Sequence, residues 1–269
     1  MRHRKRWLTG LIALLILFIP VFWGGALFVA FVAVVSAVAM HEYYNVAFGR
    51  GGPPWHSPVL LTGIAVTAVT PFAAWYGPPE MVGVVVAGNL LAIGALSLRQ
   101  FGEDPGVTAV AVKEQLGVVY IPLMLSFLVR IRAQPDGIAW LLLVLAVVFV
   151  GDTAAYHVGS AHGKRKLAPA VSPGKTVEGA LGGLAGNLAA GALFKAMLLP
   201  SLPWLSSIGF ILTMGIVGQI GDLFESQFKR INDIKDSGTL LPGHGGILDR
   251  IDALLFASPV AYLFHLTLG

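Results

Sequence analysis

The sequence predicts an all-α protein, a polytopic bundle of about nine transmembrane helices, and three observations support this fold class. Hydrophobic residues make up 56% of the 269 positions and charged residues only 12%, whereas a soluble protein carries about a quarter charged residues. The mean hydropathy is +0.77. Apolar runs long enough to cross a hydrocarbon core of about 30 Å recur along the whole chain. Because a span must satisfy its own backbone hydrogen bonds, these runs are predicted to be helices.

Nine spans are predicted from these runs, separated by segments rich in glycine and proline. Turn-forming residues stand at the breaks, as in Gly24-Gly25, Gly77-Pro78-Pro79 and Pro135-Asp136-Gly137. The first run follows a basic N-terminus and is interpreted as a membrane anchor; the alternative, a signal peptide, lacks a convincing small-residue cleavage site. The predicted spans are residues 7–22, 25–47, 58–76, 80–98, 115–131, 138–160, 175–199, 206–228 and 249–267.

The distribution of Lys and Arg predicts the orientation in the membrane. With the N-terminus in the cytoplasm, the inner segments hold 15 of the 18 basic residues, in agreement with the positive-inside rule. The exceptions are Arg130 and Arg132, in an outer loop, and Lys195, in the seventh span. Nine spans then leave the C-terminus outside.

Nearly all the unusual polar chemistry lies from Asp152 onward. Residues 1–135 are interpreted as structural transmembrane helices that face lipid or a dimer partner, and residues 136–269 as catalytic helices with cytoplasmic loops. In the first half, Glu42 and Glu80 are interpreted as interfacial residues without a functional role. The chain has no cysteine, which excludes disulfides, thiolate metal ligands and a cysteine nucleophile.

Acidic residues cluster where the predicted spans meet the cytoplasm. Ionisable groups inside a membrane cost ~2.5 kcal/mol or more each, so they mark a cavity, a partner or an ion. Carboxylates that converge at one depth repel one another unless cations lie between them, and oxygen ligands without cysteine favour Mg²⁺. The candidate metal ligands are Asp222, Asp249, Asp152, Asp252 and Glu225, of which Asp222 and Asp249 rank first.

Two of these candidates also have a purely structural interpretation. Asp249 stands at the start of the last span and could act only as a helix cap. Glu225 lies four residues before Lys229 on one helix face and could form an ordinary ion pair with it. The residues alone leave both alternatives open.

Two predicted inner loops combine glycines with basic residues. In the first, Ser172 and Thr176 are candidate caps for the seventh span, and Lys175 stands at the N-terminus of that helix, where the helix dipole attracts anions. The nucleotide P-loop spacing is absent. The second loop runs from Lys229 to Arg250. The alternative for both loops is anchoring to lipid headgroups.

The second loop contains three closely spaced motifs. They are Ser226-Gln-Phe-Lys229-Arg230, Lys235-Asp236-Ser-Gly238 and Leu241-Pro242-Gly-His244-Gly245-Gly246-Ile247-Leu-Asp249-Arg250-Ile-Asp252. Over these 27 residues, with the internal spacings intact, the chain resembles the signature of the phosphatidate cytidylyltransferase (CDP-diglyceride synthase) family. The upstream stretch Ser172-Pro-Gly-Lys175-Thr176-Val-Glu178-Gly179 resembles a second stretch of that family. The N-terminal half resembles it in span pattern only.

The resemblance implies a reaction and its setting. Phosphatidate and CTP would give CDP-diacylglycerol and pyrophosphate, with Mg²⁺ and a candidate second cation as cofactors. The protein would be a homodimer of the bacterial inner membrane, and its site would face the cytoplasm. Membrane lipids are further expected partners, and nucleic acid is not one. The expected catalytic residues are Asp222, Asp249, Lys175 and Arg250. The expected substrate-binding residues are Ser172, Lys175, Thr176, Ser226, Lys229, Arg230, Lys235, His244, Gly245, Gly246 and Arg250.

Three other function classes compete with this one. A secondary transporter also places ionisable residues among helices, but near the bilayer midplane rather than at the inner interface. A CDP-alcohol phosphotransferase would show a different Asp-rich pattern on one helix pair, which is absent from this sequence. A non-catalytic scaffold is the third. Pyrophosphate release that depends on both CTP and phosphatidate separates these classes from the cytidylyltransferase.

Overall fold

The computed structural model describes residues 15–238, 240 and 245–269, and it confirms the predicted all-α membrane architecture. Within this part of the chain, eight helical segments are long and apolar enough to cross a membrane. Residues 15–23 are helical as well. The first predicted span, residues 7–22, lies partly outside the described residues.

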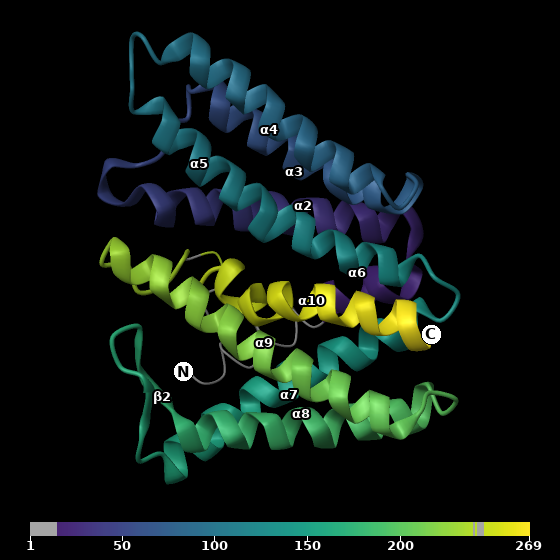
Figure 1. The fold of residues 1–269 in the computed structure, drawn as a ribbon. Coiled ribbons are helices and arrows are strands. Elements are labelled where there is room, and N and C mark those ends of the chain that lie inside the picture. Colours follow the sequence, from purple (N-terminus) through teal and green to yellow (C-terminus); the bar gives the residue numbers. More distant parts are fainter. Residues whose placement is uncertain (1–14, 239, 241–244) are drawn as a thin grey trace. The chain divides into compact units, whose positions relative to one another are not determined.

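The helices follow the predicted spans closely (Figure 1). Gly24 and Gly25, with positive φ angles of 71° and 54°, separate α2 from the helical residues before it, a conformation that glycine adopts without strain. The helices are α2 (Gly25–Phe48), α3 (Pro58–Tyr76), α4 (Met81–Gln100), α5 (Val107–Val118), α6 (Met124–Arg132), α7 (Gly137–His162), α8 (Val177–Leu198), α9 (Trp204–Ile231) and α10 (Leu248–Leu268).

The largest boundary difference concerns the predicted span 115–131. The helix begins earlier, at Val107, and α5 continues through a π-helical turn, Val119–Leu123, into α6. Pro122 lies in this turn. Because a proline lacks a backbone N–H and its ring crowds the preceding turn, the wider π turn accommodates it within a continuous helix.

A short β-hairpin follows α7, where the sequence predicts only a loop. Its strands β1 (Lys166–Ala168) and β2 (Ser172–Thr176) pair antiparallel. Ser172 therefore lies in a strand and does not cap α8, so that prediction was wrong. Thr176 is the N-cap, as predicted: its Oγ1 accepts a hydrogen bond from the Gly179 N–H at 3.1 Å.

Contacts divide the chain into two compact units built from segments distant in sequence. The N-terminal unit contains the described residues up to Ala133 together with Asn232–Asp249. The C-terminal unit contains Gln134–Ile231 and Arg250–Gly269. Most of the signature segment in the second loop thus packs with the N-terminal helices.

The apolar interior of the N-terminal unit holds a buried polar cluster. Glu114 of α5 is 0% exposed and Asn89 of α4 is 3% exposed. The Asn89 side-chain amide donates to Glu114 Oε1 at 2.9 Å and to Glu114 Oε2 at 3.1 Å. A buried carboxylate is costly without such donors, so Asn89 stabilises Glu114 in the interior.

In the C-terminal unit, α7 and α8 pack closely side by side (Figure 1). Asn187 of α8 donates to the Val147 carbonyl oxygen of α7 at 2.7 Å. A Cβ atom added at Gly151 would lie 2.0 Å from the Asn187 amide nitrogen. Small residues permit this close approach of membrane helices, and Gly151 thereby places its neighbour, Asp152, against α8 and α9.

Candidate active site

A cavity of about 380 Å³ lies within the C-terminal unit, among α7, the β-hairpin, α8 and α9. Its volume falls in the range of about 300–1,000 Å³ that is usual for ligand pockets. Five of the predicted site residues line it: Asp152, Ser172, Lys175, Thr176 and Asp222. The other lining residues are Ala155, Tyr156, Gly159, Ser160, Leu167, Gly174, Gly179, Ala180 and Gln219.

An ion pair spans this cavity. Lys175 Nζ lies 2.6 Å from Asp222 Oδ2, and the two side chains are 26% and 35% exposed. Asp152 is close enough to Lys175, Asp222 and Arg250 to interact with their charges. A lysine that balances two carboxylates and remains partly exposed can also receive an anionic ligand.

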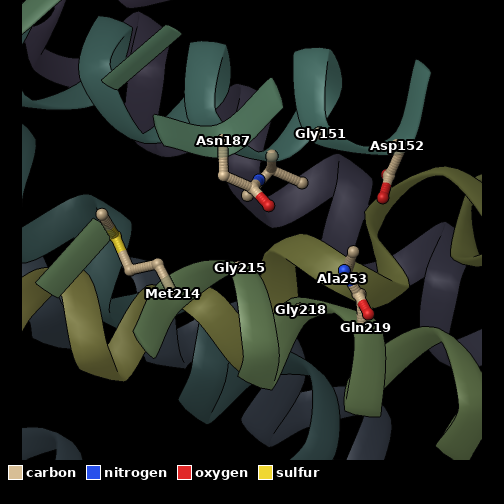
Figure 2. A pocket seen from close by; sticks show the side chains of 9 residues that line it. Gly151, Asp152, Asn187, Met214, Gly215, Gly218, Gln219 and Ala253 are labelled. Atoms are coloured by element: carbon tan, nitrogen blue, oxygen red, sulfur yellow. The ribbon is translucent and has the colours of Figure 1, made fainter. Parts of the chain in front are cut away.

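A second, much smaller cavity of about 10 Å³ lies deeper in the same unit. Figure 2 shows Asp152, Asn187 and Gln219 around it, with Gly215 and Gly218 on α9. Its volume is close to the ~10–15 Å³ needed for one water molecule. Asp152 lines both cavities, so it stands at the inner wall of the larger one.

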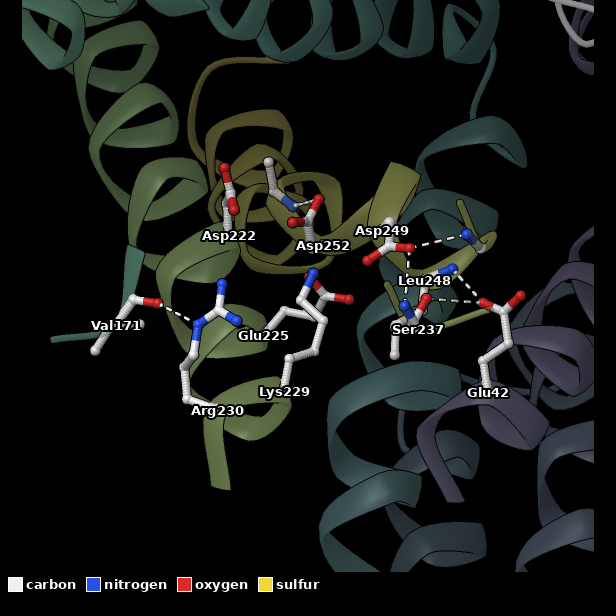
Figure 3. Close-up of polar contacts among 12 residues, drawn as sticks. Glu42, Val171, Asp222, Glu225, Lys229, Arg230, Ser237, Leu248, Asp249 and Asp252 are labelled. Atoms are coloured by element: carbon white, nitrogen blue, oxygen red, sulfur yellow. Dashed lines mark hydrogen bonds and ion pairs between the residues drawn. The ribbon is translucent and has the colours of Figure 1, made fainter. Parts of the chain in front are cut away.

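Further acidic side chains surround Asp222. Asp252 is 7% exposed and Glu225 is 2% exposed, and Asp252 interacts electrostatically with Asp222, Glu225 and Asp152. Figure 3 shows Asp222, Asp252 and Glu225 near one another beside Lys229. Together with Asp152 of α7, these residues of α9 and α10 place four of the five predicted metal ligands in the C-terminal unit.

Glu225 forms the ion pair that the structural alternative predicts. Lys229 Nζ lies 2.5 Å from Glu225 Oε2, and the side chains are only 10% and 2% exposed. Because each charge would be costly to bury alone, the two side chains partly offset that cost for each other in the interior of the C-terminal unit. That Glu225 binds metal and that Lys229 binds substrate stay predictions.

The β-hairpin that carries Lys175 is fastened at two places. Arg230 of α9 donates through Nε to the Val171 carbonyl oxygen at 3.0 Å (Figure 3). The Glu178 carboxylate, in the first turn of α8, accepts hydrogen bonds from the backbone N–H groups of Lys164 and Arg165 at 3.0 and 3.1 Å. These contacts hold the hairpin, and with it Lys175, beside the cavity.

The donor chemistry of the acidic cluster fits Mg²⁺, which prefers oxygen ligands. Among the described residues, no three His, Asp or Glu side chains converge closely enough to hold an ion by themselves. Mg²⁺ usually keeps several waters and binds through one or two carboxylates plus substrate phosphates. The cavity offers that arrangement through Asp222, with Asp152 within electrostatic reach.

Asp249 belongs to the N-terminal unit, where backbone groups of the signature segment contact it. Its Oδ2 accepts hydrogen bonds from the N–H groups of Ser237 at 3.0 Å and Gly246 at 2.8 Å. Gly245 has a φ of 80°, and a Cβ atom there would lie 2.6 Å from Asp249 Oδ2. Both donors precede α10, which begins at Leu248, so these contacts order the backbone ahead of the helix. That Asp249 and Asp222 share a cation stays a prediction.

The remaining predicted residues are in varied surroundings. Lys235 and Arg250 are exposed. Ser226 is 7% exposed on α9, and Gly246 is buried. His244 lies outside the described residues.

Sequence reasoning missed Glu42. The structure buries it to 5% exposure, and it accepts hydrogen bonds from Ser237, Ile247 and Leu248 of the signature segment. The available signal was an acidic residue at the end of an apolar span, where a charge is costly and calls for a partner.

Comparison with known proteins finds relatives along nearly the whole chain. A model of the cytidylyltransferase family matches residues 4–268. A phosphatidate cytidylyltransferase of Staphylococcus haemolyticus is 33% identical over 263 residues, and one of Staphylococcus aureus is 31% identical over 260 residues, each match covering 96% of both chains. A phosphatidate cytidylyltransferase of Bacillus subtilis is 40% identical over 148 residues, which is 55% of each chain.

Proposed function

Because this chain belongs to the cytidylyltransferase family, we propose that it transfers the cytidylyl group of CTP to phosphatidate, giving CDP-diacylglycerol and pyrophosphate. One structural observation supports this activity above all others. The cavity of about 380 Å³ presents a lysine and an aspartate, Lys175 and Asp222, in direct contact. Such a pair suits a site that binds phosphates and a divalent cation together.

The reaction joins two anions and needs no covalent enzyme intermediate. A phosphate oxygen of phosphatidate attacks the α-phosphorus of CTP, and a new P–O bond forms. The bond from that phosphorus to the oxygen bridging to the β-phosphorus breaks, and pyrophosphate leaves with the electron pair. Such a transfer depends on positioning and on neutralisation of charge rather than on a protein nucleophile.

The residues of the cavity supply both requirements. Lys175 precedes the capped N-terminus of α8, where free N–H groups and the helix dipole favour anions. An arriving phosphate can take over the ammonium group of Lys175 from Asp222, since both side chains are partly exposed. Arg250, exposed and close to Asp152, can hold a second phosphate with its planar guanidinium group.

Mg²⁺ is the proposed cofactor. When bound, it would neutralise charge on the triphosphate and on the leaving pyrophosphate. Asp222 and Asp152 are its first candidate ligands in the C-terminal unit, and Asp249 is the candidate in the N-terminal unit. The oxygen-only donor set of the cavity supports this choice.

The proposed setting is the bacterial inner membrane, with the site on the cytoplasmic side. The positive-inside distribution of 15 of the 18 basic residues supports this orientation. Only 17% of the residues in the apolar stretch of α4 are buried within the described part of the chain, so its apolar surface is available to membrane lipids or to a second copy in a homodimer.

Product analysis tests the activity. The purified protein in lipid nanodiscs that contain phosphatidate is expected to form CDP-diacylglycerol, detected by mass spectrometry, when CTP and Mg²⁺ are added. Nanodiscs with diacylglycerol in place of phosphatidate serve as the control, because that lipid lacks the nucleophilic phosphate. Absence of product from the phosphatidate nanodiscs, with the protein folded, would contradict the proposal.

A further inference from the structure

Glu42, near the end of α2, contacts residues that follow it by about two hundred positions. Its Oε2 accepts hydrogen bonds from the Leu248 N–H at 2.8 Å and from Ser237 Oγ at 3.2 Å, and its Oε1 accepts one from the Ile247 N–H at 3.1 Å. Figure 3 shows the Glu42 carboxylate directed at Ser237 and Leu248. All these residues belong to the N-terminal unit.

These contacts cap the start of α10. The helix begins at Leu248, and the first N–H groups of a helix have no partner within it. A carboxylate is a strong acceptor there, since it combines charge-assisted hydrogen bonds with the favourable helix dipole. The side chain that accepts these hydrogen bonds usually belongs to a residue next to the helix, whereas Glu42 lies 206 positions before Leu248.

Glu42 and Asp249 share the same short stretch of backbone. Asp249 accepts from the Gly246 N–H, and Glu42 accepts from the next two N–H groups, those of Ile247 and Leu248. Ser237 joins the two carboxylates, because its N–H donates to Asp249 and its hydroxyl donates to Glu42. The position of Asp249 is therefore tied to that of Glu42.

The packing around Glu42 leaves little space for movement. A Cβ atom added at Gly246 would lie 2.5 Å from Glu42 Oε2, and one added at Gly238 would lie 2.3 Å from Glu42 Oε1. Glycines of the signature segment thus lie directly against this carboxylate. The family resemblance implied instead that Gly246 binds substrate.

A second contact fastens the beginning of the same segment to α2. The Asn232 side-chain amide donates to the Val46 carbonyl oxygen at 2.7 Å. A Cβ atom at Gly49 would lie 2.4 Å from Asn232 Oδ1. The end of α2 therefore holds the signature segment both at Asn232 and at Ile247–Leu248.

We propose that Glu42 is a positioning residue for cytidylyl transfer, which fixes the backbone of residues 245–249 and thereby orients Asp249 towards the triphosphate of CTP. This inference rests on the proposed function. Outer-shell groups that orient a ligand typically change metal affinity or activity about 10- to 100-fold when they are replaced.

The test compares Glu42→Ala, Glu42→Gln and the matched control Glu80→Ala. Glu80 is exposed and precedes α4 without forming a side-chain cap. Hydrogen exchange reports on the N–H groups of residues 246–248, calorimetry measures CTP binding with Mg²⁺, and product formation gives KM and kcat. The calorimetric and exchange measurements report on the role of Glu42 even if the protein shows no turnover.

The expected result is faster exchange at 246–248 and a CTP affinity lowered about 10- to 100-fold in Glu42→Ala, with KM for phosphatidate unchanged. Glu42→Gln keeps one acceptor oxygen, so its exchange rates and its CTP affinity should lie between those of Glu42→Ala and the wild type. If Glu42→Ala does not fold, Glu42→Gln alone is compared with the wild type. The control should match the wild type.

Two results would overturn the inference. One is that both Glu42 variants show the same exchange rates at residues 246–248 and the same CTP affinity as the wild type. The other is faster exchange with unchanged CTP affinity and KM, because Glu42 would then be only a structural cap. A wild-type protein that makes no CDP-diacylglycerol would instead contradict the proposed function, and the binding data would still show whether Glu42 positions the segment.

Discussion

Lys175 on the β-hairpin and Asp222 on α9 form an ion pair at 2.6 Å in the wall of the 380 Å³ cavity of the C-terminal unit. The sequence suggested separate roles for the two residues, with one binding phosphate and the other binding metal. In the proposed mechanism the two roles are linked, because the negative charge of Asp222 would hold the ammonium group of Lys175 in place until a ligand arrives.

Replacement of Asp222 by Asn should remove this link. We expect kcat/KM for CTP to fall about 100-fold or more, since a charged group that neutralises or positions the reacting phosphates is lost. Asp233→Asn is the matched control, because Asp233 is exposed and has a φ of 54°, which Asn also tolerates. Equal turnover of the two variants, with thermal unfolding unchanged, would count against a role for Asp222.

Removal of divalent cations should stop the reaction. We expect a chelator to abolish product formation, because the charge of the triphosphate is no longer neutralised without the cation. Added Mg²⁺ should restore product formation. Asp152→Asn should raise the Mg²⁺ concentration needed for half-maximal turnover, measured by titration at saturating CTP. Full turnover in the presence of the chelator would rule out the proposed cofactor.

Thr176 should contribute to stability through its cap. Its Oγ1 accepts the Gly179 N–H at the start of α8, so Thr176→Ala is expected to destabilise the protein by about 1 kcal/mol. Thr176→Ser keeps the hydroxyl and should retain most of this stability. Thermal unfolding in detergent compares the two, and equal melting temperatures would show that the cap is dispensable.

The buried pair of Asn89 and Glu114 should be coupled. Asn89→Leu leaves the Glu114 carboxylate without its amide donor and should destabilise the N-terminal unit by about 1–3 kcal/mol. The double variant with Glu114→Leu should be less destabilised than this single variant, because both polar groups are then gone. Unfolding of the two single variants and the double variant forms a cycle, and strictly additive effects would contradict the coupling.

Much of the fold could be predicted from local features. Each span is a continuous apolar run, and each break contains residues that favour turns, so length and composition suffice to find the helices. The same holds for the acidic cluster on α9, because Asp222 and Glu225 are spaced by one helical turn. The cap of α8 at Thr176 also follows from local sequence.

Two features could not be predicted from the sequence, namely the β-hairpin and the partner of Glu42. The β-hairpin depends on pairing between Lys166–Ala168 and Ser172–Thr176 and on its contact with Arg230, and the short polar sequence shows no alternation that marks a strand. Glu42 binds a helix start 206 positions away. Nothing in the surroundings of Glu42 along the chain identifies that partner.

The most direct test of the central claim is pyrophosphate release by the purified protein in the presence of Mg²⁺. We expect release only when CTP and phosphatidate are both present, in an amount equal to the CDP-diacylglycerol formed, and we expect Asp222→Asn to abolish it. Release that needs no phosphatidate, or none from the folded wild-type protein with both substrates, would contradict it.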